Sequence, residues 1–445
     1  MMADLGPGLI TLVLFGSLVV VLMAGLPLAF ALGGVGTVFI MLLWGPQGLG
    51  VLASRAYMTM GSFILIAIPM FVFMGAMLNQ AGIADDLFTM MYHWLGQLRG
   101  GLAAGTVLIC TLFAAMVGIS GASTVSMGLL ALPAMLNRGY QKQLALGCIC
   151  AGGALGILIP PSVVMIILGL FGQLSVGQLF LGGVLPGLLL SALYVIYILI
   201  RSYFQKEIAP AVPRDEMIPW RARLGLLPKL VFPIALIFVV MGSIFFGMAT
   251  PTEASAIGAT GAVVCALIKK RLTWKNFTES LFTTMRLSSM VLWIIIAAAA
   301  FTALYAITGA QEFIASILLS APGGRWGAVI IMQVVFFVLG CFLDTTGILM
   351  LTTPIFFPVI RELGFDPLWF GVVFVVNMEM AFLTPPFGLN LFFLKGVAPP
   401  EVTMADIYRS IGPFVALQAL GLVLVMVFPW LATWLPSLMI TRPPA

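Results

Sequence analysis

The sequence predicts an all-α polytopic membrane protein with two inverted-topology repeats, each containing a re-entrant helical hairpin and a helix broken by a Pro-Pro pair. Hydrophobic residues make up 62% of the 445 residues and charged residues only 8%, whereas about a quarter of a soluble domain is charged. The pair Pro160-Pro161 recurs as Pro385-Pro386, 225 residues later, in similarly apolar sequence. Basic residues cluster beside the apolar runs, as in membrane-protein loops.

Nearly the same offset relates further proline and glycine positions of the two halves. Single matches would carry little weight in a chain with 48 Gly and 27 Pro, but seven ordered matches at offsets between 221 and 227 indicate a duplication. Two membrane repeats with interrupted apolar segments at matching positions predict a secondary transporter, whose site lies at the repeat interface near mid-membrane. The other pairs are Pro27 with Pro251, Gly34 with Gly258, Gly82 with Gly309, Pro133 with Pro354 and Gly139 with Gly364.

Ten apolar runs have the length of membrane spans or of pieces of spans, because a helix that crosses roughly 30 Å of hydrocarbon needs about 20 apolar residues. We expect about a dozen crossings in the lipid bilayer, some of them broken. No basic segment or small-residue cleavage site precedes the first run, so we expect a retained helix rather than a signal peptide. The runs are 8–24, 26–44, 63–78, 181–200, 231–248, 254–268, 288–307, 328–343, 369–383 and 411–435.

The net charge of +5 belongs to loops beside these runs rather than to a surface for nucleic acid. Short loops rich in Lys and Arg stay in the cytoplasm, and residues 231–268 between two basic clusters are long enough for two helices, so both clusters fit that side. Residues 1–7 carry Asp4 and no Lys or Arg, so we expect both termini to be periplasmic. The clusters are Arg201, Lys206, Arg214, Arg221, Arg223 and Lys229, then Lys269, Lys270, Arg271, Lys275 and Arg286.

Each repeat is expected to contain scaffold helices, an amphipathic arm, the hairpin and the broken helix, in that order. The arms follow Gly82 and Gly309 and carry acidic residues near their starts, which suits a helix N-terminus. The least apolar internal stretch falls at the midpoint and is expected to be a cytoplasmic linker. The boundaries are 1–200 for the first repeat (arm 84–98, hairpin 101–136, broken helix 141–175), 201–229 for the linker, and 230–445 for the second repeat (arm 310–320, hairpin 328–358, broken helix 367–396).

Polar residues interrupt one apolar stretch in each half, and neither arm of these stretches is comfortably long enough to span the membrane alone. A re-entrant hairpin tip explains this better than a full crossing. Non-helical backbone at membrane depth survives only where protein or a water-filled cavity covers it, so two facing tips would enclose a cavity. The candidate binding residues are Ser120, Gly121, Ser123 and Thr124 in the first tip, and Asp344, Thr345, Thr346 and Gly347 in the second.

The two Pro-Pro segments are predicted to unwind their helices, since proline removes a backbone donor and clashes with the preceding turn. The freed carbonyls suit Na⁺, and exposed helix N-termini suit an anionic group. A simple kink repaired by neighbouring Ser and Thr is the alternative, which the repetition of the break disfavours. The candidate residues are Gly156, Pro160, Pro161 and Ser162 in the first break, and Thr384, Pro385, Pro386, Gly388 and Asn390 in the second.

Three carboxylates lie in otherwise apolar sequence: Glu253, Asp344 and Glu379. A charge at the centre of a membrane helix costs at least about 2.5–3.5 kcal/mol, so such residues are functional candidates. Asp344 is the strongest because it occupies a hairpin tip. Glu253 follows a proline that can start a helix, and both a structural role and an ion-coupling role remain open for it. Glu379 is expected to pair with Lys395, to lie at a protein interface, or to touch the transport path.

The tips and broken segments contain no Lys or Arg, so a carboxylate substrate would be bound by backbone amides, hydroxyls and coupling ions, with Lys395 the nearest basic side chain. We expect no enzyme, because Asp344 lacks the second carboxylate that aspartyl chemistry uses. A passive channel would show charged rings or carbonyl filters, which are not visible. The single histidine, His93, excludes a metal site of the two-His type. The cysteines are expected to be packing residues: Cys110, Cys148, Cys150, Cys265 and Cys341.

Five motifs, spread in order over nearly the whole chain, resemble the large permease (M) subunit of tripartite ATP-independent periplasmic (TRAP) transporters. The resemblance implies an elevator-type Na⁺ symporter of the bacterial cytoplasmic membrane, similar in fold to divalent anion/sodium symporters. It also implies that a periplasmic binding protein delivers a small organic anion, often a carboxylate, and that a small membrane (Q) subunit extends the scaffold. The motifs are Gly25–Gly33 (GLPLAFALG), Ser120–Ser123 (SGAS), Gly156–Ser162 (GILIPPS), Ala249–Ala254 (ATPTEA) and Leu383–Pro386 (LTPP).

Matched residue by residue, the resemblance implies one Na⁺ site around Ser120–Ser123 with Gly156–Ser162. It implies a second around Asp344–Gly347 with Thr384–Asn390, and no organic cofactor. No small-subunit sequence is appended, so the Q subunit is expected to be a separate polypeptide. A self-sufficient anion/Na⁺ symporter of the related fold is the alternative, and proton coupling through Asp344 or Glu379 stays open beside Na⁺ coupling.

Overall fold

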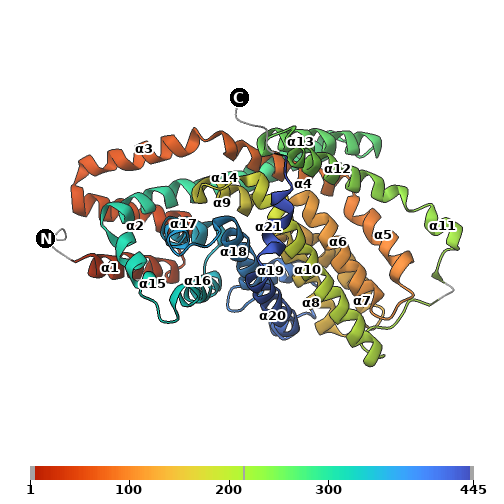
Figure 1. The fold of residues 1–445 in the computed structure, drawn as a ribbon. Coiled ribbons are helices and arrows are strands. Elements are labelled where there is room, and N and C mark those ends of the chain that lie inside the picture. Colours follow the sequence, from red (N-terminus) through yellow and green to blue (C-terminus); the bar gives the residue numbers. More distant parts are fainter. Residues whose placement is uncertain (1–5, 214–215, 441–445) are drawn as a thin grey trace.

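The computed structural model describes residues 6–213 and 216–440 (Figure 1). Within these residues all regular secondary structure is helical and no strand occurs, and six helices are long and apolar enough to cross a membrane. The predicted all-α polytopic class is therefore confirmed. Asp4, Arg214 and the two chain ends lie outside the described residues, so the expected periplasmic position of the termini stays a prediction.

The first half contains ten α-helices, several of which are shorter than a membrane crossing. α5 corresponds in position to the expected arm, α6 and α7 to the hairpin, and α8 and α9 to the broken helix. The bounds are α1 Pro7–Met23, α2 Leu28–Trp44, α3 Leu49–Met60, α4 Ala67–Gln80, α5 Ile83–Leu95, α6 Gly101–Val117, α7 Ser120–Leu136, α8 Lys142–Ala154, α9 Val163–Gly172 and α10 Val176–Phe204.

The second half follows the same order after a short helix in the linker. The hairpin of this half consists of α16 and α17 and runs from Gly324 to Glu362. It is therefore a few residues longer at each end than the expected range 328–358. The bounds are α11 Trp220–Leu224 in the linker, α12 Pro228–Phe245, α13 Pro251–Ile268, α14 Trp274–Ile307, α15 Ala310–Leu319, α16 Gly324–Gly340, α17 Thr345–Glu362, α18 Pro367–Ala381, α19 Leu389–Val397, α20 Met404–Val427 and α21 Trp430–Ser437.

Matching backbone features recur at matching places in the two halves. Gly82 and Gly309, which precede α5 and α15, both have φ = +72°, a conformation that glycine adopts at little cost because it lacks a Cβ. Both Pro-Pro peptide bonds are cis. The halves differ at one point: residues 61–66 separate α3 from α4, whereas the corresponding α14 is one helix of 34 residues. The sequence duplication is thus visible as repeated local structure.

One group of helices, which we call the scaffold, consists of α1 to α4 and α12 to α14. Its closest pairings join the two halves, since α4 packs on α13 and α2 packs on α14. Small residues allow this approach: a Cβ on Gly36 would lie 3.5 Å from the backbone of Phe301, and one on Gly33 would lie 3.5 Å from the Cβ of Ala297. The scaffold is therefore one interlocked unit rather than two separate halves (Figure 1).

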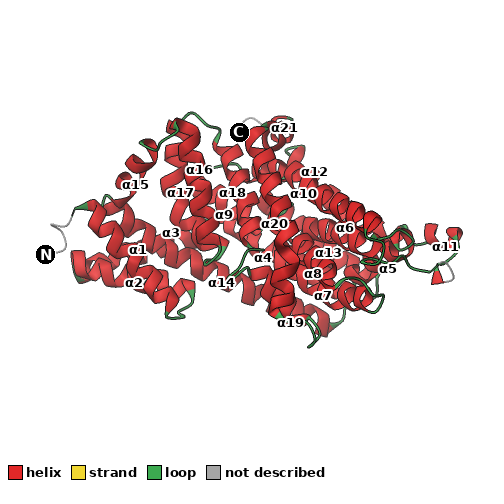
Figure 2. Cartoon of the chain, turned by 90° about the horizontal axis from the view of Figure 1, so that it is seen from below, coloured by secondary structure: helices red, strands yellow, loops and turns green. Residues whose placement is uncertain are grey.

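The hairpins and broken helices form a second group, and they also exchange partners between the halves (Figure 2). α7 of the first hairpin packs on α19, where Gly121 faces the ring of Phe393. α17 of the second hairpin packs on α9, where the Arg361 guanidinium donates to the Gly172 carbonyl at 2.8 Å. Each hairpin thus lies against the broken helix of the other half.

Ion pairs connect the α5 arm to the scaffold and bring the two basic clusters together. Asp86 of α5 binds Lys229 at the start of α12, with 2.8 Å between Oδ1 and Nζ, and also Lys269 at the end of α13. Although partial burial acts in the opposite direction, the hydrogen bonds from these two lysines hold the pKa of Asp86 below its usual value. One residue from each basic cluster therefore contacts the same carboxylate.

Candidate functional site

The first hairpin tip lies directly against the first Pro-Pro break. Gly118 ends α6 in a left-handed conformation with φ = +68°, and its carbonyl accepts a hydrogen bond from the Val163 amide at 3.4 Å. A Cβ on Gly118 would lie 2.2 Å from the carbonyl oxygen of Pro161. Only glycine fits this close approach, and it brings the tip to the point where the broken helix resumes as α9.

The residues predicted for the first Na⁺ site are brought together at this contact. A Cβ on Gly156 would lie 2.9 Å from the amide nitrogen of Ser120, and one on Gly153 would lie 2.0 Å from the hydroxyl of Thr124. Ser123 is fully buried and its hydroxyl has no hydrogen-bond partner among the described residues. Ser162 caps α9 and donates to the Ile157 carbonyl at 2.5 Å.

The second tip differs from the first because a carboxylate caps the helix that follows it. Asp344 accepts a hydrogen bond from the Thr346 amide at 2.9 Å and so caps α17. Beside it the buried hydroxyl of Thr345 has no partner among the described residues. The tip approaches the second break through the rings of Phe342 and Phe387, whose centroids are 6.4 Å apart. Asp344 therefore has a structural role as a cap, and its carboxylate also lies at the tip.

The second break makes a contact across the two halves. The side-chain amide of the buried Asn390 donates to the Cys150 carbonyl of α8 at 3.0 Å, and its Oδ1 atom has no partner among the described residues. Gly388 has φ = +33°, in the left-handed region, and starts α19. The Thr384 hydroxyl is turned back to the Met380 carbonyl at 2.9 Å. Of these residues, Asn390 is the one directed into the core between the repeats.

The remaining two carboxylates lie elsewhere. Glu253 forms a capping box with Thr250 at the start of α13, where its Oε2 accepts from the Thr250 amide at 2.8 Å, so it is a helix cap on the scaffold and is exposed. Glu379 of α18 is fully buried, and neither of its oxygens has a partner that meets hydrogen-bond geometry among the described residues. It does not pair with Lys395, whose ammonium donates to the Val402 carbonyl at 2.7 Å.

The neighbours of Glu379 were not predicted from the sequence. Gln418 of α20 and Tyr194 of α10 are buried beside it, and their side-chain polar atoms also lack hydrogen-bond partners among the described residues. Three helices, α10, α18 and α20, thus bring one polar side chain each to a buried cluster. No spacing in the sequence connects residues 194, 379 and 418, so only the packing of α10, α18 and α20 shows this cluster.

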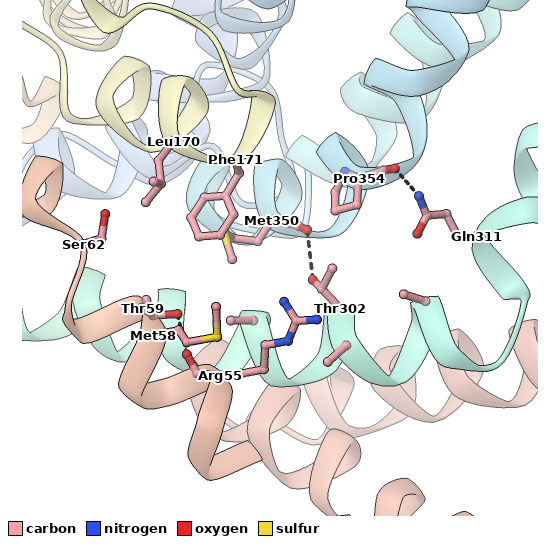
Figure 3. Close-up of a pocket in the computed structure, with 13 residues that line it drawn as sticks. Arg55, Met58, Thr59, Ser62, Leu170, Phe171, Thr302, Gln311, Met350 and Pro354 are labelled. Atoms are coloured by element: carbon pink, nitrogen blue, oxygen red, sulfur yellow. Dashed lines mark hydrogen bonds between the residues drawn. The ribbon is translucent and has the colours of Figure 1, made fainter. Parts of the chain in front are cut away.

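A cavity of about 560 Å³ lies between the scaffold and the second hairpin. One wall comes from α3 and α14, and the other comes from α9 and α17 (Figure 3). Of the described residues that line it, Arg55 alone carries a charge, and sequence reasoning missed it. The available signal was an isolated basic residue between two long apolar runs. The polar lining residues are Arg55, Thr59, Ser62, Thr302 and Gln311.

Comparison with known proteins places the chain among membrane permeases. Residues 15–431 match the family described as "Tripartite ATP-independent periplasmic transporter, DctM component". The chain belongs to this family. It is 34% identical to the C4-dicarboxylate TRAP transporter large permease protein DctM of Pseudomonas aeruginosa, over 90% of this chain and 91% of that protein. It is 30% identical to the isethionate TRAP transporter permease protein DctMQ of Oleidesulfovibrio alaskensis, over 94% of this chain and 65% of that protein.

The resemblance seen in five short motifs is therefore confirmed, and the chain is a TRAP large permease. A solved structure supports the fold of this permease. The YdaH transporter of Alcanivorax borkumensis superimposes with a TM-score of 0.63, over 95% of this chain and 100% of that chain. Since the two sequences are only 14% identical, the likeness concerns the fold alone.

Proposed function

We propose that this TRAP permease imports a small organic anion across the bacterial cytoplasmic membrane, with Na⁺ as the coupling ion. The observation that carries the proposal is the pair of tips and breaks, which present buried oxygen atoms without hydrogen-bond partners. These atoms are Ser123 Oγ at the first tip, Thr345 Oγ1 at the second tip and Asn390 Oδ1 at the second break. Buried polar atoms are normally satisfied, so each unsatisfied oxygen calls for a partner.

A small hard cation is the partner that this chemistry favours, because such ions take oxygen ligands from hydroxyls, side-chain amides and backbone carbonyls. The Pro-Pro breaks add carbonyls that no helix uses. In our proposal the first Na⁺ site combines Ser120–Ser123 with Gly156–Ser162, and the second combines Asp344–Gly347 with Thr384–Asn390. When bound, Na⁺ would neutralise the negative end of the second tip and favour an anionic substrate between the tips.

The two groups of helices support an elevator mechanism, in which the hairpins and broken helices move as one body against the scaffold. The hairpin group is tied together across the halves by contacts such as Asn390 to Cys150 and Arg361 to Gly172. One hydrogen bond joins the scaffold to the second hairpin, from Thr302 to the Met350 carbonyl at 3.3 Å, and another joins the α15 arm to that hairpin, from Gln311 to the Pro354 carbonyl at 2.5 Å. α14 also packs on α17 along this boundary, and packed helices can slide past one another in a shear motion.

The substrate class and the partners follow from the family and its relatives. The relatives described above are named for a C4-dicarboxylate and for isethionate, both small organic anions. The family name is tripartite, so we propose a periplasmic binding protein and a small membrane (Q) subunit as the other two components. We propose that the Q subunit is a separate polypeptide.

The test is uptake of labelled succinate, a C4-dicarboxylate, and of labelled isethionate into proteoliposomes that contain this chain and its neighbouring small subunit. Uptake is measured with and without the cognate binding protein, under an inward Na⁺ gradient or an equal K⁺ gradient. We expect uptake that requires both Na⁺ and the binding protein. Uptake by this chain alone would assign it to the self-sufficient symporters instead. Uptake that follows a pH gradient and ignores Na⁺ would contradict Na⁺ coupling.

A further inference from the structure

The cavity between the scaffold and the second hairpin contains a cation, Arg55, that forms no ion pair with the residues the structure describes. The Arg55 guanidinium points into the cavity from α3 (Figure 3). The ion pairs found among the described residues all involve other cations. Arginine stays charged, and the exposed side chain of Arg55 is the one charged group among the described residues that line this cavity. Arg55 therefore gives the cavity a positive charge, which favours an anion.

We propose that Arg55 forms an anion subsite on the scaffold, which holds the carboxylate or sulfonate group of the transported substrate beside the second hairpin. The planar guanidinium matches the two oxygens of such a group in a bidentate arrangement, which a point charge cannot reproduce. The hydroxyl of Ser62 is a further donor on the same wall. This subsite rests on the proposed function, because it names a residue that would contact the transported anion.

The position of the cavity fits a substrate more closely than a structural ion. Met350 of its opposite wall lies six residues after Asp344, which is about 9 Å along α17 from the second tip. The two walls belong to different bodies, the scaffold and the hairpin group. An anion at Arg55 would thus contact the fixed body beside a tip of the moving one. A volume of about 560 Å³ lies within the range of small-molecule sites.

The first experiment reads the charge of the cavity without requiring transport. The Ser62→Cys variant is prepared in complex with the small subunit and placed in phosphatidylcholine vesicles. It is then treated with one of two methanethiosulfonate reagents, the anionic sulfonatoethyl or the cationic trimethylammonioethyl compound. The five native cysteines are buried, so the unsubstituted chain gives the background. The rate of each reagent is divided by its own rate with a free thiol in solution. We expect this normalised rate to be at least about ten-fold higher for the anionic reagent, because a charged cavity concentrates counter-ions.

Arg55→Gln should abolish this preference, while Arg286→Gln should retain it. Arg286 is the matched control because it is an exposed arginine on the scaffold helix α14 and does not line the cavity. If the preference for the anionic reagent survives in Arg55→Gln, the subsite is overturned.

The second experiment asks whether the anion is the substrate or a lipid phosphate. We expect Arg55→Gln to raise the KM for Na⁺-driven uptake about ten-fold with little change in maximal rate, and Arg55→Lys to recover only part of the loss. Addition of phosphatidylglycerol should leave the thiol preference unchanged. Loss of the preference in phosphatidylglycerol vesicles would assign Arg55 to a lipid headgroup and overturn the proposal. An unchanged KM would overturn the subsite alone, whereas absent uptake by the wild type would overturn the proposed function.

Discussion

At the scale of single residues, some of the buried oxygen atoms without hydrogen-bond partners lie at the hairpin tips and at the second break. Ser123, Thr345 and Asn390 carry such atoms at the tips and at the second break. Glu379 carries two more in a cluster away from the tips. The first group lies at the hairpin tips and at the second break, whereas Glu379 lies within α18, before the second break. We propose an ion-binding role for the first group and a packing role for Glu379.

Asn390→Ala tests the ion-binding role. The change removes the Oδ1 atom proposed as a Na⁺ ligand and the bond to the Cys150 carbonyl. We expect the Na⁺ concentration for half-maximal uptake to rise about ten-fold or more, since losing a hydrogen bond to a charged group costs about 1.5–3 kcal/mol. The readout is uptake against Na⁺ concentration in proteoliposomes. Asn137→Ala, on the exposed end of α7, is the control and should leave the Na⁺ dependence unchanged.

Glu379 provides a second prediction, on stability. Glu379→Gln keeps the shape and can hydrogen-bond to Gln418, so we expect the thermal midpoint of the purified complex to stay within a few degrees. Glu379→Ala leaves a cavity beside the buried Gln418, and a large-to-small change in a packed core typically costs about 2–4 kcal/mol. The check is thermal unfolding in detergent. Equal midpoints for the alanine variant and the wild type would show that the cluster has no role in packing.

At the scale of elements, local steric rules explain most of the helix boundaries. The helices before both Pro-Pro pairs end at Ala154 and Ala381, several residues before the prolines that cannot continue them. Glycines with positive φ precede the arms. The elements differ in how they are anchored. α5 is held to the scaffold by ion pairs, and the loop after α7 is held to the linker by a separate set of polar contacts.

The contact between that loop and the linker gives a prediction. Arg138 binds Glu216 of the linker, and its guanidinium also donates to the Tyr92 hydroxyl of α5 at 2.6 Å. The hydrogen bond from Arg138 lowers the pKa of Glu216, so the carboxylate is charged at neutral pH and the contact is lost only as the pH falls through that lowered value. Glu216→Gln should therefore speed trypsin cleavage within 201–229 at pH 7, by severalfold. Glu207→Gln, in the same linker, is the control and should not.

At the scale of the whole molecule, helices of one repeat pack on helices of the other. The scaffold and the hairpin group therefore each contain helices from both repeats. α2 and α4 pack on α14 and α13, and α7 and α17 pack on α19 and α9. Each repeat therefore contributes to both bodies, so neither half can move as a unit. In the proposed elevator mechanism, the boundary that slides runs between the scaffold and the hairpin group, along the cavity that contains Arg55.

Cross-linking tests this boundary. Thr302→Cys with Met350→Cys, joined by a short bifunctional thiol reagent, would tie α14 to α17, which lie in different bodies. We expect uptake to fall to background and to return when the link is reduced. Gly33→Cys with Ala297→Cys is the control, because the two Cβ positions are 3.5 Å apart within the scaffold and suit a disulfide. Full uptake by the Thr302–Met350 cross-linked protein would contradict the elevator mechanism.

The sequence by itself determined the class, the duplication and the places where helices break. These follow from composition and from proline and glycine sterics, which act over a few residues and are readable at positions such as Pro160, Gly118 and Pro385. The motif order also identified the family. Expectations that required a partner from another segment were less secure: the expected pairing of Glu379 with Lys395 is not formed, because the Lys395 ammonium binds the Val402 carbonyl.

Only the tertiary structure decided which segments face each other. Arg55 stands alone in the sequence, and its cavity exists because α3 and α14 lie opposite α9 and α17. The same holds for Asn390 and Cys150, which are 240 residues apart. The sequence of an apolar helix says little about which helix packs against it. Lipid and protein interiors favour the same side chains, so the partner is selected by packing rather than by hydrophobicity.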